Sequence, residues 1–200
     1  MTRMARRGPT PAASIDDWLN LVDPDGAFLT ASLLRAAFPH GFDPMAADQR
    51  ADLRAQVADA ITDPDTTRAA LRQWLLGTVL EWGDQLAEGQ QLPVTSLVRA
   101  AEHGVHLRPS QALLDVDDAN LIRVAVFVWP TGTRLDRRPD IAIAGDTWPA
   151  SPVQRAETWC RESGVPLALV TDDDQWALVW APRSAPAASC RWRISNPEVG

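Results

Sequence analysis

LIRVAVFVWP (residues 121–130) is an almost wholly apolar run, and it decides the fold of the chain. Val124, Val126 and Val128 place a β-branched residue at every second position, which favours a strand. The residues between these valines are apolar as well, so we expect both faces of the strand to be covered. Such a strand belongs inside a layered α/β core rather than in a sheet with one exposed face.

The rest of the C-terminal half supplies elements that cover or flank this strand. Ser151 and Pro152 open an amphipathic helix that Gly164 ends, and this helix is expected to cross over to a second buried strand at 166–171. Further short strands are predicted at 96–100, 104–108, 111–116 and 175–180, with an edge strand at 191–195 after a loop at 182–189.

The N-terminal half has a helical pattern instead. Residues 1–13 are read as a disordered lead, residues 14–92 as a helical subdomain and residues 93–196 as the α/β core. Asp23–Gly26 has the composition of a turn between the first two helices. The tryptophans of the helical part are expected to pack between helices rather than stack on bases: Trp18, Trp74 and Trp82. The fold class is therefore α+β, a helical layer followed by a mixed sheet with a crossover helix.

Composition limits the function. The net charge of −7 argues against a surface that binds nucleic acid throughout, although a local basic patch remains compatible with it. The chain has no lysine, so lysine Schiff-base chemistry and a P-loop lysine are excluded. Cys160 and Cys190 are expected to be buried free thiols of a cytoplasmic protein. No apolar segment is long enough to span a membrane, and no membrane partner is expected.

Motifs for a bound metal or cofactor are missing. On a strand, the side chains of His103 and His106 would point to opposite faces, and no cysteine or carboxylate completes a metal set. The glycines do not form a phosphate-binding loop after a strand. We therefore predict neither a metal nor a cofactor.

The order of elements between 104 and 180 is similar to the core of PD-(D/E)XK nucleases. In these enzymes an aspartate near the start of one strand and an E-x-K on the next strand act together on a divalent metal. Ser110 stands here where the aspartate would, and Phe127 and Trp129 stand where the glutamate and lysine would. None of the three is a ligand for Mg²⁺, which predicts a degenerate site without catalytic residues.

An endonuclease with migrated acidic ligands is the alternative. Its candidate ligands are Asp115, Asp117 and Asp118, within LLDVDDAN. The same residues are also typical of a strand that runs into a hairpin turn.

Four segments carry a wider family resemblance: residues 17–44 (DWLNLVDPDGAFLTASLLRAAFPHGFDP), LRPSQALLD, VFVWPTGTRLDRR and GVPLALVTDDDQWALVWAPR. Together they resemble the N-terminal region of large bacterial DNA methyltransferase-restriction proteins of the type IIG-like and phage-defence (DISARM-type) classes. The most characteristic block is Gly164–Trp176. The resemblance implies a nuclease-like region, often degenerate, that works beside a SAM-dependent methyltransferase; no methyltransferase part is present in these 200 residues.

Three functions therefore stay open: an inactive nuclease-like module that contacts DNA or a methyltransferase partner, a metal-dependent endonuclease, and a protein-interaction domain without DNA contact. The candidate DNA contacts are arginines: Arg108, Arg134, Arg137 and Arg138. The alternative for the last three is a solvated loop that pairs with Asp136 and Asp140.

Overall fold

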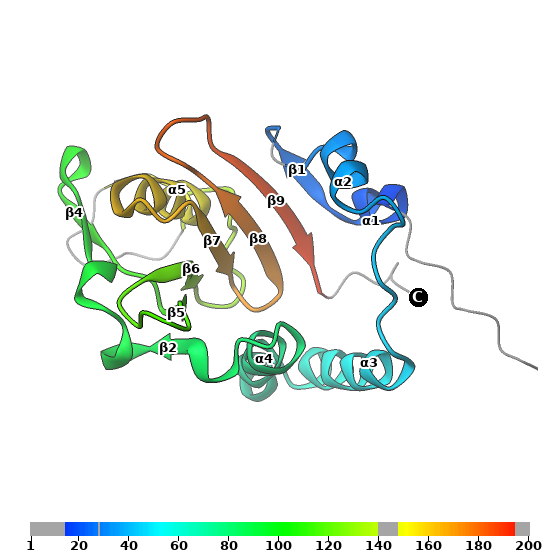
Figure 1. Ribbon diagram of the computed structural model, residues 1–200. Coiled ribbons are helices and arrows are strands. Elements are labelled where there is room, and N and C mark those ends of the chain that lie inside the picture. The colour runs from blue at the N-terminus through cyan, green and yellow to red at the C-terminus, as the bar shows by residue number, and fades with distance from the viewer. Residues whose placement is uncertain (1–14, 28, 140–147, 195–200) are drawn as a thin grey trace, which may run out of the picture.

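The computed structural model describes residues 15–27, 29–139 and 148–194, with the backbone alone for 64–66. Its fold is α+β, built on a mixed seven-stranded sheet in the order β1-β9-β8-β7-β6-β5-β2 (Figure 1). The strands are β1 (Asp23–Asp25), β2 (Leu86–Glu88), β5 (Gln111–Leu114), β6 (Ile122–Val128), β7 (Leu167–Thr171), β8 (Gln175–Trp180) and β9 (Ala188–Arg193). β6 and β7 run parallel, whereas the other neighbours in this sheet are antiparallel.

Strand β6 lies inside the sheet between β5 and β7, and both of its faces are covered, as the alternating pattern predicted. Ala125 and Phe127 belong to the larger apolar cluster on one face. Val126 is fully buried in a second cluster on the other face, and Val124 and Val128 pack against that cluster.

Helix α5 (Pro152–Ser163) covers the first face and makes the parallel crossover from β6 to β7 (Figure 1). Its capping box is complete: the amide of Gln154 donates to Ser151 Oγ at 3.1 Å, and the amide of Ser151 donates to Gln154 Oε1 at 2.9 Å. Gly164 ends the helix in the left-handed conformation. Trp159 of α5 is fully buried in the cluster between the helix and the sheet.

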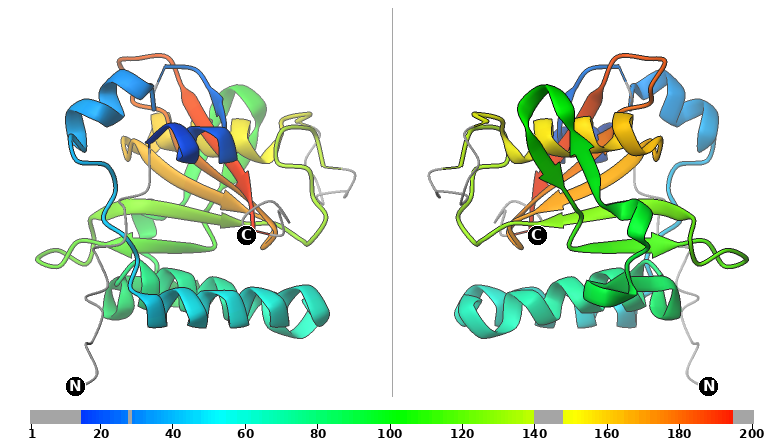
Figure 2. Two further views of the ribbon diagram at one scale, coloured as in Figure 1. Left: turned by 90° about the vertical axis from the view of Figure 1, so that its right-hand side faces the viewer. Right: turned by 90° about the vertical axis from the view of Figure 1, so that its left-hand side faces the viewer.

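The second face of the sheet is covered by α4 (Pro64–Trp74), which continues as a π-helical turn at Leu75–Val79. Leu76 of this turn packs on Val126, Leu169 and Trp176, and Trp82 lies against the same cluster. Helix α3 (Ala47–Thr62) packs on α4 and has Ala60 as its buried residue. In Figure 2, α3 and α4 form one layer on the far side of the sheet from α5.

The first two helices, α1 (Ile15–Leu21) and α2 (Ala31–Ala37), flank β1 beyond β9 (Figure 1). Two predictions were wrong here. Asp23–Asp25 forms a strand rather than only a turn, because it pairs with Ser189–Arg191. β9 is consequently an interior strand rather than an edge, and it begins inside the predicted loop.

The segment between α4 and β5 contains a series of short turns. Four 3₁₀ turns occupy it: Gly83–Gln85, Gly89–Gln91, Val94–Ser96 and Ala101–His103. The predicted strand at 96–100 is shortened to β3 (Val98–Ala100), which pairs with β4 (Val105–Leu107) in a separate ribbon. β2 was not predicted; it pairs with β5.

The predicted lead, residues 1–13, lies outside the described residues, and the boundary at 92/93 stays a prediction. Within the ranges described, no helix has the length and hydropathy to cross a bilayer. Cys160 and Cys190 are both buried and free, as predicted.

Candidate functional site

Two of the positions compared above with a nuclease active site lie side by side in the structure. Ser110 immediately precedes β5, and its amide donates to the carbonyl of Val126 at 2.8 Å. In return, the amide of Val128 donates to Ser110 Oγ at 3.1 Å. The Ser110 hydroxyl therefore stabilises the end of β6, which is a structural role within the sheet and not a role in a functional site.

Phe127 and Trp129 pack against apolar neighbours. The Phe127 ring meets Trp159 edge-on, with centroids 5.7 Å apart, and Phe127 is only 6% exposed. Trp129 is partly buried against the same cluster, and its amide donates to the carbonyl of Thr171 at 2.7 Å. A phenyl and an indole in these places complete the core beside α5.

The candidate acids of the endonuclease alternative lie at the other end of β5. Asp115 follows the strand and accepts hydrogen bonds from the amides of Asp117 and Asp118 and from Arg123. These bonds, first among them that from the Asp117 amide, lower the pKa of Asp115. The four residues of β5 separate Asp115 from Ser110, about 16 Å along a strand. The acids and Ser110 therefore do not share one site.

The two histidines do not lie on one strand. His103 ends a 3₁₀ turn and stacks on Trp148 with centroids 3.9 Å apart, while His106 lies in β4. Within the described part of the chain, no three His, Cys, Asp or Glu side chains form a group that could hold a metal.

The four candidate arginines fall into two places. Arg108 donates to the carbonyl of Gly89 at 3.0 Å and to Ser96 Oγ at 3.3 Å, so it braces the 3₁₀ turns. Arg134 and Arg137 lie in the loop after β6 and pair with Asp136 at 3.6 and 3.9 Å. Arg138 is exposed in the same loop, and Asp140 lies outside the described residues.

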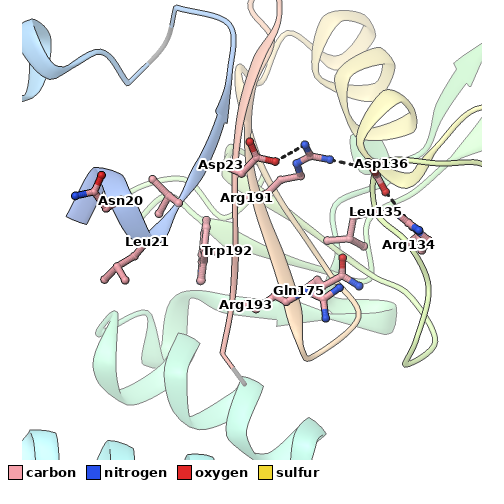
Figure 3. Close-up of a pocket in the computed structure, with 11 residues that line it drawn as sticks. Asn20, Leu21, Asp23, Arg134, Leu135, Asp136, Gln175, Arg191, Trp192 and Arg193 are labelled. Atoms are coloured by element: carbon pink, nitrogen blue, oxygen red, sulfur yellow. Dashed lines mark hydrogen bonds and ion pairs between the residues drawn. The ribbon is translucent and has the colours of Figure 1, made fainter. Parts of the chain in front are cut away.

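The loop that carries these arginines lines a pocket of about 400 Å³ beside β9 (Figure 3). The pocket is formed by the end of α1 and start of β1 (Asn20–Asp23), the loop residues Arg134–Asp136, Gln175 of β8, and Arg191, Trp192 and Arg193 of β9. It thus brings together three arginines from two distant segments.

An ion-pair network fixes the wall of this pocket. Arg191 donates to Asp23 at 2.5 Å and pairs with Asp136 at 3.5 Å, so it links β1, β9 and the loop after β6. Partial burial acts to raise the pKa of Asp136, but its own backbone amide and the charges of Arg134, Arg191 and Arg137 outweigh burial and lower the pKa. Asp136 therefore stays ionised and holds the network together.

Asp172 holds the start of the loop after β6 through a hydrogen bond to its backbone. This buried carboxylate accepts hydrogen bonds from the amides of Gln175 at 2.6 Å, Gly132 at 2.9 Å and Asp174 at 3.1 Å. It therefore joins the β7–β8 turn to the segment that leads into Arg134. Asp172–Asp174 form the turn between β7 and β8, and Asp172 is its central acceptor.

Sequence reasoning missed the contribution of β9 to the site. The signal was present in the alternation Arg191-Trp192-Arg193, because successive strand residues point to opposite faces. This pattern places two arginines on one face beside Gln175, with which Arg193 is paired in register.

Comparison of the chain with protein-family models, with curated proteins and with solved structures finds no match.

Proposed function

We propose that the chain is a catalytically inactive, nuclease-like module of a bacterial DNA restriction-modification or phage-defence system, and that it contacts DNA or a methyltransferase partner. The order of hairpin, crossover helix and parallel strand from β5 to β7 supports the comparison with the PD-(D/E)XK core. The four segments that resemble DNA methyltransferase-restriction proteins support a role in such a system.

One observation carries the proposal. Ser110 and Phe127 lie on neighbouring chain segments at the positions compared with the acids of such a nuclease. Ser110 accepts a hydrogen bond from the backbone, and Phe127 packs on Trp159. A metal-dependent nuclease requires carboxylates at this point to hold the cation. This arrangement with these side chains supports a module that contacts DNA without cleaving it.

Contact with DNA is assigned to the loop after β6. Arg134 and Arg137 are 58% and 67% exposed at their side chains, and their partner Asp136 is shared between them and Arg191. The carboxylate therefore cannot satisfy all three guanidinium groups, and donors remain for phosphate oxygens.

The test is binding and cleavage of a 20-base-pair duplex and a plasmid. We expect weak, sequence-tolerant binding whose log K falls with log salt at a slope near −3, about −0.9 for each arginine. The variant Arg134→Ala/Arg137→Ala/Arg138→Ala should flatten the slope without changing the melting temperature. Plasmid should stay uncut with Mg²⁺ or Mn²⁺. If the parent protein cuts the plasmid and Asp115→Ala does not, the endonuclease is favoured. If the parent and the triple variant have equal salt slopes, the loop has no role in DNA contact.

A protein-interaction domain is the second candidate. Large apolar side chains are exposed on the N-terminal helices, Leu21 at 42%, Leu33 at 52% and Phe38 at 44%. If the duplex does not bind at low salt, this candidate takes the place of the DNA-contact proposal.

A further inference from the structure

We propose that the pocket beside β9 binds one nucleotide of a single nucleic-acid strand, with the phosphate on the arginines and the base against Trp192. This inference rests on the proposed DNA contact and adds the class of ligand and three residues of β9. The evidence is the division of the pocket into a cationic side and an apolar side (Figure 3).

The cationic side has hydrogen-bond donors to spare. Arg134 pairs with Asp136 and Arg193 with Asp174, each at 3.6 Å, which is longer than a hydrogen bond. A guanidinium group has five N–H donors, and the side chains of Arg134 and Arg193 are 58% and 59% exposed. Both can therefore turn an edge of N–H donors to a phosphate group.

Arg191 adds a positive charge that is already in place. Its terminal nitrogens pair with Asp23 and Asp136, and its Nε is buried with no acceptor among the residues that the structure describes. Two carboxylates fix the position of the Arg191 side chain, so its positive charge stays at the wall of the pocket, where it favours an oxyanion.

The apolar side of the pocket lies at the edge of β9, next to the end of its pairing with β1. β1 pairs with β9 only as far as Arg191, so Trp192 lies beyond the end of that pairing. Because strand residues alternate, Trp192 lies on the opposite face of β9 from the two arginines and lines the pocket at the edge of this strand. It stacks on Trp176, with centroids 6.4 Å apart and planes 16° apart. Leu21, which is 42% exposed, lines the same side. An indole held by a second indole offers a rigid surface for a base.

Size and chemistry select a single strand over a duplex. The pocket of about 400 Å³ is at the lower end of the range for small-ligand sites, which suits one nucleotide and is too small for a double helix. Bases of a single strand stack on aromatic side chains without sequence preference, beside a basic groove that follows the backbone. The arginines and Trp192 provide both parts within one pocket.

The experiment measures fluorescence anisotropy of a 3′-labelled hexathymidylate with a 5′-phosphate and of a labelled 20-base-pair duplex, at 50 mM salt. We expect the hexamer to bind more tightly than the duplex. Arg193→Ala and Trp192→Leu should each weaken hexamer binding about tenfold, the effect typical of a lost base stack or phosphate contact. Trp192→Phe should retain most of the affinity, which separates stacking from a loss of fold.

Arg99→Ala is the matched control, because Arg99 is an exposed arginine on β3, away from the pocket. It removes the same charge and should change hexamer affinity less than twofold. The inference is overturned, and DNA contact stands, if the duplex binds more tightly or if Arg193→Ala behaves like Arg99→Ala. If neither probe binds the parent protein, the pocket inference and the DNA contact both fail.

Discussion

The ion pair between Arg72 and Asp173 offers a direct test of how the sheet and its helical cover are joined. Arg72 lies on α4, and Asp173 lies in the β7–β8 turn that also carries Asp172 and Gln175. The side chains are only 13% and 10% exposed. We predict that Arg72→Met destabilises the protein strongly, because it leaves the Asp173 carboxylate without its partner in a mostly buried place.

The size of the expected loss in unfolding free energy follows from the burial of the Arg72–Asp173 pair. Removal of one member of a buried pair costs about 3–5 kcal/mol, and the residual exposure of both groups places this pair near the lower end. A loss of about 3 kcal/mol corresponds to a fall of about 6–12 °C in the melting temperature of a domain of this size. Arg35→Met is the matched control: Arg35 and Asp16 are 58% and 66% exposed, so this pair contributes less than about 1 kcal/mol.

A double variant separates the charge from the packing. Asp173 has a φ of 71°, and asparagine tolerates this left-handed conformation, so Asp173→Asn removes the charge without new backbone strain. We expect Arg72→Met/Asp173→Asn to recover much of the stability lost in Arg72→Met. Urea unfolding of the four proteins in the cycle gives the coupling free energy.

The pH dependence has a defined sign. Burial raises the pKa of Asp173, and Arg72 only partly offsets the effect, so Arg72→Met should raise the pKa further. A carboxyl that keeps its proton more strongly when folded makes the protein less stable as the pH rises from about 3.8 through the folded-state pKa. The difference in unfolding free energy between Arg72→Met and the double variant should therefore become smaller as the pH falls from 7 to 4. A single variant within 1 kcal/mol of the parent at pH 7, with no such narrowing, would refute the reasoning.

Three further predictions concern the core and the turn. Val126→Asp places a charge at a fully buried position of β6 and should cost several kcal/mol, seen as loss of the cooperative melting transition; a variant that melts within a few degrees of the parent would contradict this. Burial raises the pKa of Cys160 to about 12 and also raises that of Cys190, so a thiol reagent at pH 8 should label neither before unfolding; rapid labelling of the native protein would refute it. Asp172→Ala leaves three amides without their acceptor and should cost roughly 3 kcal/mol, with faster hydrogen exchange at Gly132; unchanged exchange there would show that the turn does not hold the loop.

Strand β6 and helix α5 could be predicted from the sequence because their signals are local. Alternating valines define β6, while a capping residue, an amphipathic pattern and a terminal glycine define α5. β1 and β2 gave no such signal. Each has three residues, and Asp23–Asp25 has the composition of a turn. They are strands only because β9 and β5 offer them partners, and no pattern within three residues reveals a partner so far away in sequence.

Pairing between strands that are distant in sequence also explains why only part of the pocket could be predicted. Proximity in sequence grouped Arg134, Arg137 and Arg138, but it could not show that β9 returns beside their loop. That placement depends on the antiparallel pairing of β8 with β7 and of β9 with β8, and on Asp172, which joins the β7–β8 turn to Gly132. Arg108 was grouped with the loop by charge alone, whereas its hydrogen bonds assign it to the 3₁₀ turns. The arginines that share a pocket are therefore those that sheet topology brings together, and the comparison of Arg193→Ala with Arg99→Ala measures how much a position in the pocket adds to the binding of a single strand.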